Sequence, residues 1–142
     1  MTVVIDASVA LKWVLAEEGS DAADALLEVD DLVAPSLWQL EVANALWRRV
    51  VRGELSSPEA DERLTALLSA PVATVPLEEV LAAAFRLAGD LNHPVYDCLY
   101  LALALREDTH VVTADRRFVA AAGALPALFA RVRMLGAGVT GR

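Results

Sequence analysis

The fold of this chain is decided by the run Thr2-Val3-Val4-Ile5-Asp6, a short β-branched stretch that ends on an acidic residue. A second run, Val111-Val112-Thr113, is followed in a similar way by Asp115. Such runs are typical of strands in a parallel sheet that is covered on both faces. Ligands of open α/β sheets bind at the carboxyl ends of the strands, so we expect Asp6 and Asp115 to share one crevice.

Short apolar runs alternate with longer helical stretches along the whole chain. The predicted strands cover residues 3–6, 32–34, 72–75, 111–113 and 132–135, and the predicted helices cover residues 8–16, 21–29, 37–52, 57–69, 77–90, 95–106 and 116–122. The candidate N-caps are Ser8, Ser20, Ser36 and Ser57. This alternation predicts an α/β fold with a central parallel sheet flanked by helices on both faces, in three layers. The order of the strands cannot be read from these patterns.

The length of 142 residues fits one domain, which we place at residues 1–135, and the glycine-rich residues 136–142 are expected to form a frayed tail. Hydrophobic residues make up 56% of the chain, which suggests that some apolar surface is covered by a partner. The longest apolar stretch, residues 118–130, is interrupted by Gly123 and Pro126 and is too short to span a membrane. The single cysteine, Cys98, and the absence of a secretory signal predict a cytoplasmic protein.

The formal net charge of −8 argues against a nucleic-acid partner when it is taken alone. Its distribution changes that expectation, because seven acids fall between Glu17 and Asp31 while arginines cluster at residues 48–52 and 116–117. Bound divalent cations would also neutralise a group of carboxylates. A metal-loaded crevice flanked by arginines could therefore accept a polyanion.

Four acids, Asp6, Glu41, Asp97 and Asp115, stand out by their local context. Each also has a simpler explanation: Asp6 and Asp115 could cap helices, Asp97 could favour a helix dipole, and Glu41 could belong to a solvated polar stripe. Several carboxylates in one crevice repel each other unless a cation neutralises them, and oxygen ligands suit Mg²⁺ or Mn²⁺. Together the acids point to a metal-dependent hydrolase that acts on a phosphate ester.

The chain resembles PIN-domain ribonucleases, and most closely the VapC-type toxins of bacterial toxin–antitoxin pairs. The resemblance is carried by VVIDAS at residues 3–8, Glu41, HPVYDCLYLALA at residues 93–104 and VVTADRRF at residues 111–118. It implies a PIN-like sheet, Mg²⁺ or Mn²⁺ on Asp6, Glu41, Asp97 and Asp115, an RNA substrate, a homodimer and a cognate antitoxin. It also implies cleavage that leaves a 5′-phosphate and a 3′-hydroxyl.

The resemblance gives the remaining polar residues supporting roles. Ser8 and Thr113 match small polar positions that orient a carboxylate or a metal-bound water. Arg48, Arg116 and Arg117 are candidates for phosphate contacts. The chemistry needs neither histidine, because His93 and His110 lie near no other histidine or cysteine at metal-ligand spacing. Cys98 is expected to pack as a small hydrophobic residue.

Three other readings compete with a nuclease. A phosphoacceptor receiver domain needs an acidic pair after its first strand and a late lysine, whereas the only lysine here is Lys12. A haloacid-dehalogenase-like phosphatase needs a second Asp where Ser8 stands. A degenerate PIN domain that acts only as a binding or scaffold protein is the strongest of the three, although all four acids are present.

Overall fold

The computed structural model describes residues 1–137. Its elements are, in chain order, β1 (Thr2–Ile5), α1 (Ala7–Ala10), η1 (Leu11–Trp13), α2 (Ser20–Val29), β2 (Asp31–Pro35), α3 (Leu37–Val51), α4 (Ser57–Leu68), β3 (Val72–Val75), η2 (Leu77–Glu79), α5 (Leu81–Leu91), α6 (Val95–Arg106), β4 (Val111–Thr113), α7 (Arg116–Gly123) and β5 (Val132–Met134). The predicted tail covers residues 136–142, of which residues 138–142 lie outside the described residues.

The five strands form one parallel sheet in the order β3-β2-β1-β4-β5. β1 is the central strand, and its Val4 pairs with Val33 of β2 on one side and with Val111 of β4 on the other. The chain builds the sheet outwards from β1 in one direction through β2 and β3, and then returns to add β4 and β5. The reversal lies between β1 and β4, and in open α/β sheets ligands bind beside the carboxyl ends of the strands at such a point.

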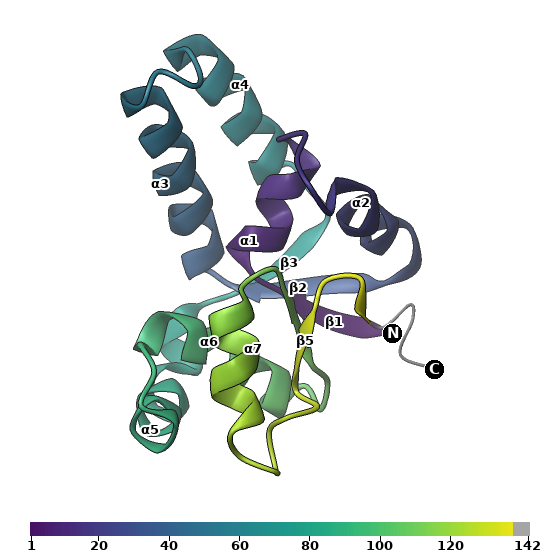
Figure 1. Cartoon of the computed structure of the whole chain (residues 1–142), viewed down its shortest axis with the longest axis vertical. Helices are drawn as coiled ribbons and strands as arrows, with labels where there is room; N and C mark the ends of the chain where they lie inside the picture. Colours follow the sequence, from purple (N-terminus) through teal and green to yellow (C-terminus); the bar gives the residue numbers. More distant parts are fainter. Residues whose placement is uncertain (138–142) are drawn as a thin grey trace.

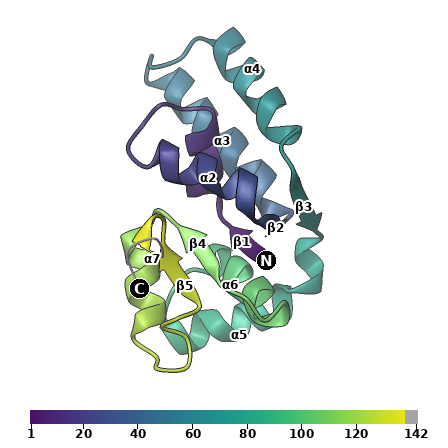
Figure 2. The same ribbon diagram turned by 90° about the vertical axis from the view of Figure 1, so that its right-hand side faces the viewer.

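Helices cover both faces of the sheet, which confirms the predicted three-layer α/β architecture. In Figures 1 and 2, α1 to α4 lie on one side of the sheet and α5 to α7 lie on the other. α3 and α4 form a hairpin that projects away from the sheet, while α6 packs across β1, β2 and β4. α5 covers the outer side of α6.

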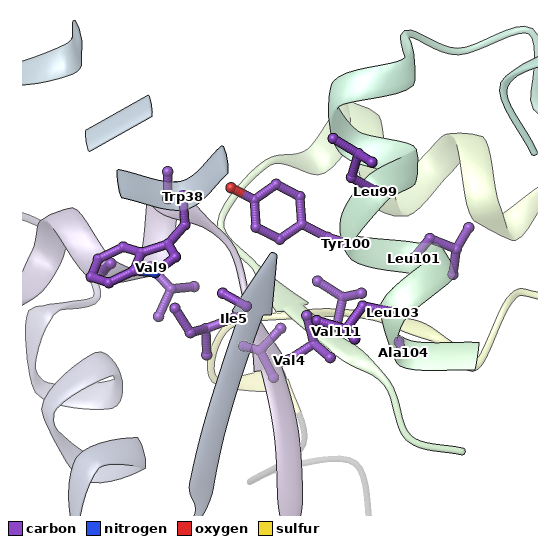
Figure 3. Packing of buried hydrophobic residues seen from close by; sticks show 14 of the residues in the cluster. Val4, Ile5, Val9, Trp38, Leu99, Tyr100, Leu101, Leu103, Ala104 and Val111 are labelled. Carbon is purple, nitrogen blue, oxygen red and sulfur yellow. The ribbon is translucent and has the colours of Figure 1, made fainter. Parts of the chain in front are cut away.

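The core is centred on α6 and the three middle strands. Residues 98–104 of α6 are all buried, as expected for a helix that is enclosed by other elements. Figure 3 shows Leu103 of α6 beside Val4 and Val111 of the sheet. Cys98 is fully buried there, which agrees with the predicted packing role. Of the three tryptophans, Trp38 is buried, whereas Trp47 is 59% exposed.

Several helix starts differ from the predictions because the capping side chains form other hydrogen bonds than expected. α1 is capped by Asp6 and not by Ser8, and it ends at Ala10. The cap of α4 is Ser56, one residue before the predicted Ser57, and it forms a capping box with Glu59. Ser36 precedes α3 without capping it, because its hydroxyl accepts a hydrogen bond from the backbone N–H of Leu77.

Two further boundaries were predicted incorrectly. The expected helix over residues 77–90 is divided into η2 and α5 at Val80, where the backbone leaves the helical conformation (φ −120°, ψ 2°). α2 begins at Ser20, but its N-cap is Gly19, which adopts a left-handed backbone with φ of 89°. In residues 1–137, no helix is both long enough and apolar enough to cross a bilayer.

Candidate active site

The four acids singled out from the sequence, Asp6, Glu41, Asp97 and Asp115, line one cavity of about 280 Å³. Its other lining residues are Ala7, Ser8, Leu11, Ala45 and Arg48. The cavity lies at the carboxyl ends of β1 and β4, beside the reversal in strand order. The fold therefore gathers four carboxylates that are up to 109 positions apart in the chain into one crevice.

Different local signals place the acids. Asp6 follows β1 and Asp115 follows β4, and each caps the helix that comes next by accepting a backbone N–H, from Val9 and Arg117 respectively. The capping role and the cavity-lining role are thus compatible. Asp97 lies in the first turn of α6, and Glu41 lies in the second turn of α3.

Two hydroxyl groups hold the carboxylate of Asp6. Ser8 Oγ donates to Asp6 Oδ1 at 2.6 Å, and Thr113 Oγ1 donates to Asp6 Oδ2 at 2.5 Å. The backbone fixes the direction of both bonds, because Ser8 Oγ accepts from the N–H of Ala114 and Thr113 Oγ1 accepts from the N–H of Asp115. Each hydroxyl then has its single proton left for Asp6.

Burial dominates the electrostatics of Asp6, whose exposed fraction is only 5%. Burial raises the pKa of Asp6 to about 6, and the hydrogen bonds from Ser8 and Thr113 limit that rise. The negative charge of Asp97 raises the pKa slightly further. At neutral pH this site therefore carries a buried negative charge, which nearby positive charge would stabilise.

Glu41 is held by a residue that the sequence reading did not single out. Tyr100, which is fully buried in α6, donates its hydroxyl proton to Glu41 Oε1. Figure 3 shows this hydroxyl on the side of the core where Trp38 begins α3. Burial raises the pKa of Glu41 and, together with the Glu41 charge, raises the pKa of Tyr100. The phenol therefore stays protonated and remains a donor.

Asp97 is also held by a partner, His93, to which sequence analysis assigned no role. His93 Nε2 is 2.6 Å from Asp97 Oδ2, and the two residues are four positions apart. The imidazole stacks on Phe118 of α7, with ring centroids 5.7 Å apart and an interplanar angle of 11°. His93 is positioned by the turn between α5 and α6, in which Asn92 adopts a left-handed backbone.

The three candidate arginines lie in different places. Arg48 lines the cavity from α3, one turn beyond Ala45 and two turns beyond Glu41. Arg116 and Arg117 are exposed at the start of α7, directly after Asp115. Asn44, one turn beyond Glu41 on α3, lines a neighbouring cavity.

The donor set suits a hard divalent cation, because four carboxylates line one cavity and one of them is a buried charge. In the part of the chain that the structure describes, no three Asp, Glu, His or Cys side chains converge as a complete set of metal ligands. Protein donors hold every acid instead: hydroxyls hold Asp6, Tyr100 holds Glu41, His93 faces Asp97, and a backbone N–H holds Asp115.

Comparison with known proteins places this fold and these acids in one family. The sequence model of the PIN domain matches residues 3–124, a range that includes all four acids. A protein named Ribonuclease VapC3, from Pyrobaculum aerophilum, is 35% identical over 120 residues, which are 82% of this chain and 92% of that protein.

Solved structures share the fold. The crystal structure of PAE2754 from Pyrobaculum aerophilum aligns with a TM-score of 0.70 and 22% identity, covering 99% of this chain and 88% of that one. A toxin–antitoxin complex from Klebsiella pneumoniae aligns with a TM-score of 0.62 and 13% identity, covering 83% of this chain and 90% of that one.

Proposed function

Since this chain belongs to the PIN domain family, we propose that it is an endoribonuclease that depends on Mg²⁺ or Mn²⁺ and hydrolyses phosphodiester bonds. The observation that carries the proposal is the convergence of Asp6, Glu41, Asp97 and Asp115 on one cavity beside the reversal in strand order. The name of its relative, Ribonuclease VapC3, supports RNA as the substrate.

The four carboxylates are the proposed metal ligands, as the family resemblance implies. A bound divalent cation would supply a water of lowered pKa and a positive charge that stabilises the leaving oxygen. The protein's own contribution is to hold the acids. Ser8 and Thr113 fix both oxygens of Asp6, Tyr100 fixes Glu41, and His93 fixes Asp97. These contacts orient three of the four carboxylates before the substrate arrives.

Arg48 is proposed to contact a phosphate of the RNA, because it is the basic residue in the lining of the acid cavity. Among residues 1–137 its guanidinium forms no ion pair, so it is available to an anion. Arg116 and Arg117 are exposed beside Asp115 and could contact further phosphates along the RNA strand.

We also propose that the protein is the toxin of a toxin–antitoxin pair, acts in the cytoplasm and forms a homodimer. Support comes from exposed apolar side chains that a partner could cover. On α3 these are Trp47 (59% exposed) and Val51 (64%), which lie one turn apart on one side of the helix.

A catalytically inactive binding protein is the second candidate. The observation that favours it is that no complete set of metal ligands converges within residues 1–137. The two candidates differ in one measurable property, because an inactive protein neither cleaves RNA nor is stabilised by a divalent cation.

The test is cleavage of an end-labelled, structured RNA by the purified protein in Mn²⁺ and in EDTA. Asp6→Asn removes one negative charge with almost no change in volume and is expected to abolish cleavage. Asp24→Asn, an exposed acid on α2, is the matched control and is expected to retain it. In parallel, Mn²⁺ is expected to raise the melting temperature of the wild type and of the control, but not of Asp6→Asn.

Full metal-dependent activity of Asp6→Asn would contradict the assignment of the site. Absence of both cleavage and metal stabilisation in the wild type would favour the inactive binding protein.

A further inference from the structure

A second hollow adjoins the acid cavity and has a different chemical character. It has a volume of about 390 Å³ and is lined by Leu37, Leu40, Glu41, Asn44 and Tyr96. This volume falls within the range of small-ligand pockets, ~300–1,000 Å³. Glu41 lines both cavities, so the hollow begins where the acid cavity ends.

The elements that build the acid cavity also build this hollow. On α3, Leu37 and Asn44 lie one turn to either side of Glu41, and Leu40 directly precedes it. On α6, Tyr96 directly precedes Asp97, and the two side chains line different cavities. Any shift of these helices that moved the acids would therefore move the hollow with them.

Three features of the lining are those of a base-binding surface. Tyr96 is 64% exposed and offers an aromatic ring, and Leu40, which is 68% exposed, offers an apolar contact. The amide of Asn44 is exposed, and within residues 1–137 it has no hydrogen-bond partner. Proteins that recognise single-stranded RNA stack unpaired bases on aromatic side chains and bond their edges with polar groups.

We propose that this hollow binds an unstacked nucleobase of the RNA, next to the phosphate that is cleaved. The proposal rests on the proposed ribonuclease function. When the scissile phosphate lies at the four acids, the base of an adjoining nucleotide has to lie on a neighbouring surface. The hollow that shares Glu41 offers that base a ring to stack on and an amide to bond with.

A second copy of the chain could instead cover Tyr96 and Leu40, since exposed apolar side chains also occur in dimer interfaces. The polar part of the lining favours a nucleotide. Asn44 and Glu41 would have to lose water against a protein partner, whereas a base edge can bond with the amide. The proposal therefore commits to the base, and the dimer is an outcome of the test.

The test is a cycle that combines a change in the protein with a change in the RNA. The shortest RNA that the wild type cleaves is resynthesised with an abasic nucleotide on either side of the scissile bond. Stacking of one base is worth ~1–3 kcal/mol, so the abasic nucleotide at one side is expected to lower kcat/KM about tenfold or more. Tyr96→Leu is expected to lower kcat/KM by the same factor on the intact RNA. On that abasic RNA, Tyr96→Leu is expected to have the same kcat/KM as the wild type.

Two variants control for indirect effects. Tyr96→Phe keeps the ring and is expected to lose less activity than Tyr96→Leu and to keep the sensitivity to the abasic nucleotide. Phe129→Leu alters an equally exposed aromatic residue, 66% exposed, outside both cavities, and is expected to behave as the wild type on both RNAs.

The outcomes separate this inference from the function on which it rests. Wild-type cleavage with equal losses for Tyr96→Leu on intact and abasic RNA overturns the base pocket and leaves the nuclease standing. If Tyr96→Leu also dissociates the protein in sedimentation velocity, the hollow belongs to a dimer interface. No metal-dependent cleavage by the wild type overturns the nuclease and, with it, the base pocket.

Discussion

The hydroxyl of Thr113 connects two of the four acids. It donates to the Asp6 carboxylate and accepts from the backbone N–H of Asp115, and it is fully buried. A methyl group in its place would leave one oxygen of Asp6 without its donor and one backbone N–H without its acceptor. The loss would therefore affect the orientation of an acid and the stability of the fold together.

Thr113→Val is expected to destabilise the protein by about 1–3 kcal/mol, the usual cost of a buried group left without its partner, and to abolish most metal-dependent cleavage. Thr109→Val is the matched control. Its hydroxyl is also buried and donates to the backbone carbonyl of Thr2 at 2.6 Å, away from the acids. Urea unfolding should show a similar decrease in the free energy of unfolding for both variants. Cleavage should be lost only in Thr113→Val. Equal activity of the two would mean that the Asp6 contact is structural.

At the scale of elements, α6 and the turn before it hold two acids of the site. His93, Asp97 and Tyr100 are spaced four and three residues apart, so they lie along one side of the helix and its start. His93 reaches Asp97, while Tyr100 reaches across to Glu41 on α3. Because His93 also stacks on Phe118, α7 contributes to the position of Asp97 as well.

His93→Phe should keep the stacked ring but remove the nitrogen that faces Asp97. We expect Mn²⁺ binding by calorimetry to weaken about 10–100-fold, the usual effect of losing a residue that orients a metal ligand, with little change in melting temperature of the metal-free protein. His93→Gln offers a side-chain amide to Asp97 and should recover part of the affinity. Unchanged binding by His93→Phe would show that Asp97 needs no such support.

The sequence allowed part of this arrangement to be predicted, for identifiable physical reasons. Asp6 and Asp115 could be located because strand runs and helix caps are local patterns, and parallel strands bring their carboxyl ends together. His93 could not be recognised, because its contact with Asp97 depends on a left-handed turn at Asn92 and on a ring 25 positions away. Tyr100 appeared to be an ordinary core residue, since its partner Glu41 lies 59 positions away.

The same limit applied to the sheet and to the helix starts. The alternation of runs predicted five parallel strands, but the order β3-β2-β1-β4-β5 depends on pairings between distant segments, which no local pattern encodes. The cap at Ser36 was mistaken because its hydroxyl bonds Leu77, 41 positions further along the chain. Local patterns predicted where elements lie, and tertiary contacts decided which side chains met.

At the scale of the whole molecule, the buried charge of Asp6 links stability to pH. The folded-state pKa of about 6 lies above the ordinary value of 3.8, so the folded protein holds this proton more tightly than the unfolded chain does. The resulting stabilisation is complete below pH 3.8 and is lost as the pH rises through about 6. Its size is about 2–3 kcal/mol, at about 1.4 kcal/mol per pKa unit.

The measurement is urea unfolding of the wild type and Asp6→Asn in EDTA between pH 4 and pH 7.5. The free energy of unfolding of the wild type, relative to the variant, should decrease across this interval. Mn²⁺ added at pH 7.5 should restore stability to the wild type alone. A difference that stays constant with pH would show that Asp6 does not carry the buried charge.

The central position of β1 also determines when, during synthesis of the chain, the acid site can be completed. Asp6 is synthesised before the other three acids, and β1 meets β4 only after more than a hundred further residues have been added. Asp115 follows β4, so a growing chain on the ribosome holds an incomplete site until Asp115 has been added. The proposed RNA-cutting site is therefore incomplete, and cannot cut the messenger RNA or the ribosome, while the residues before Asp115 are being synthesised.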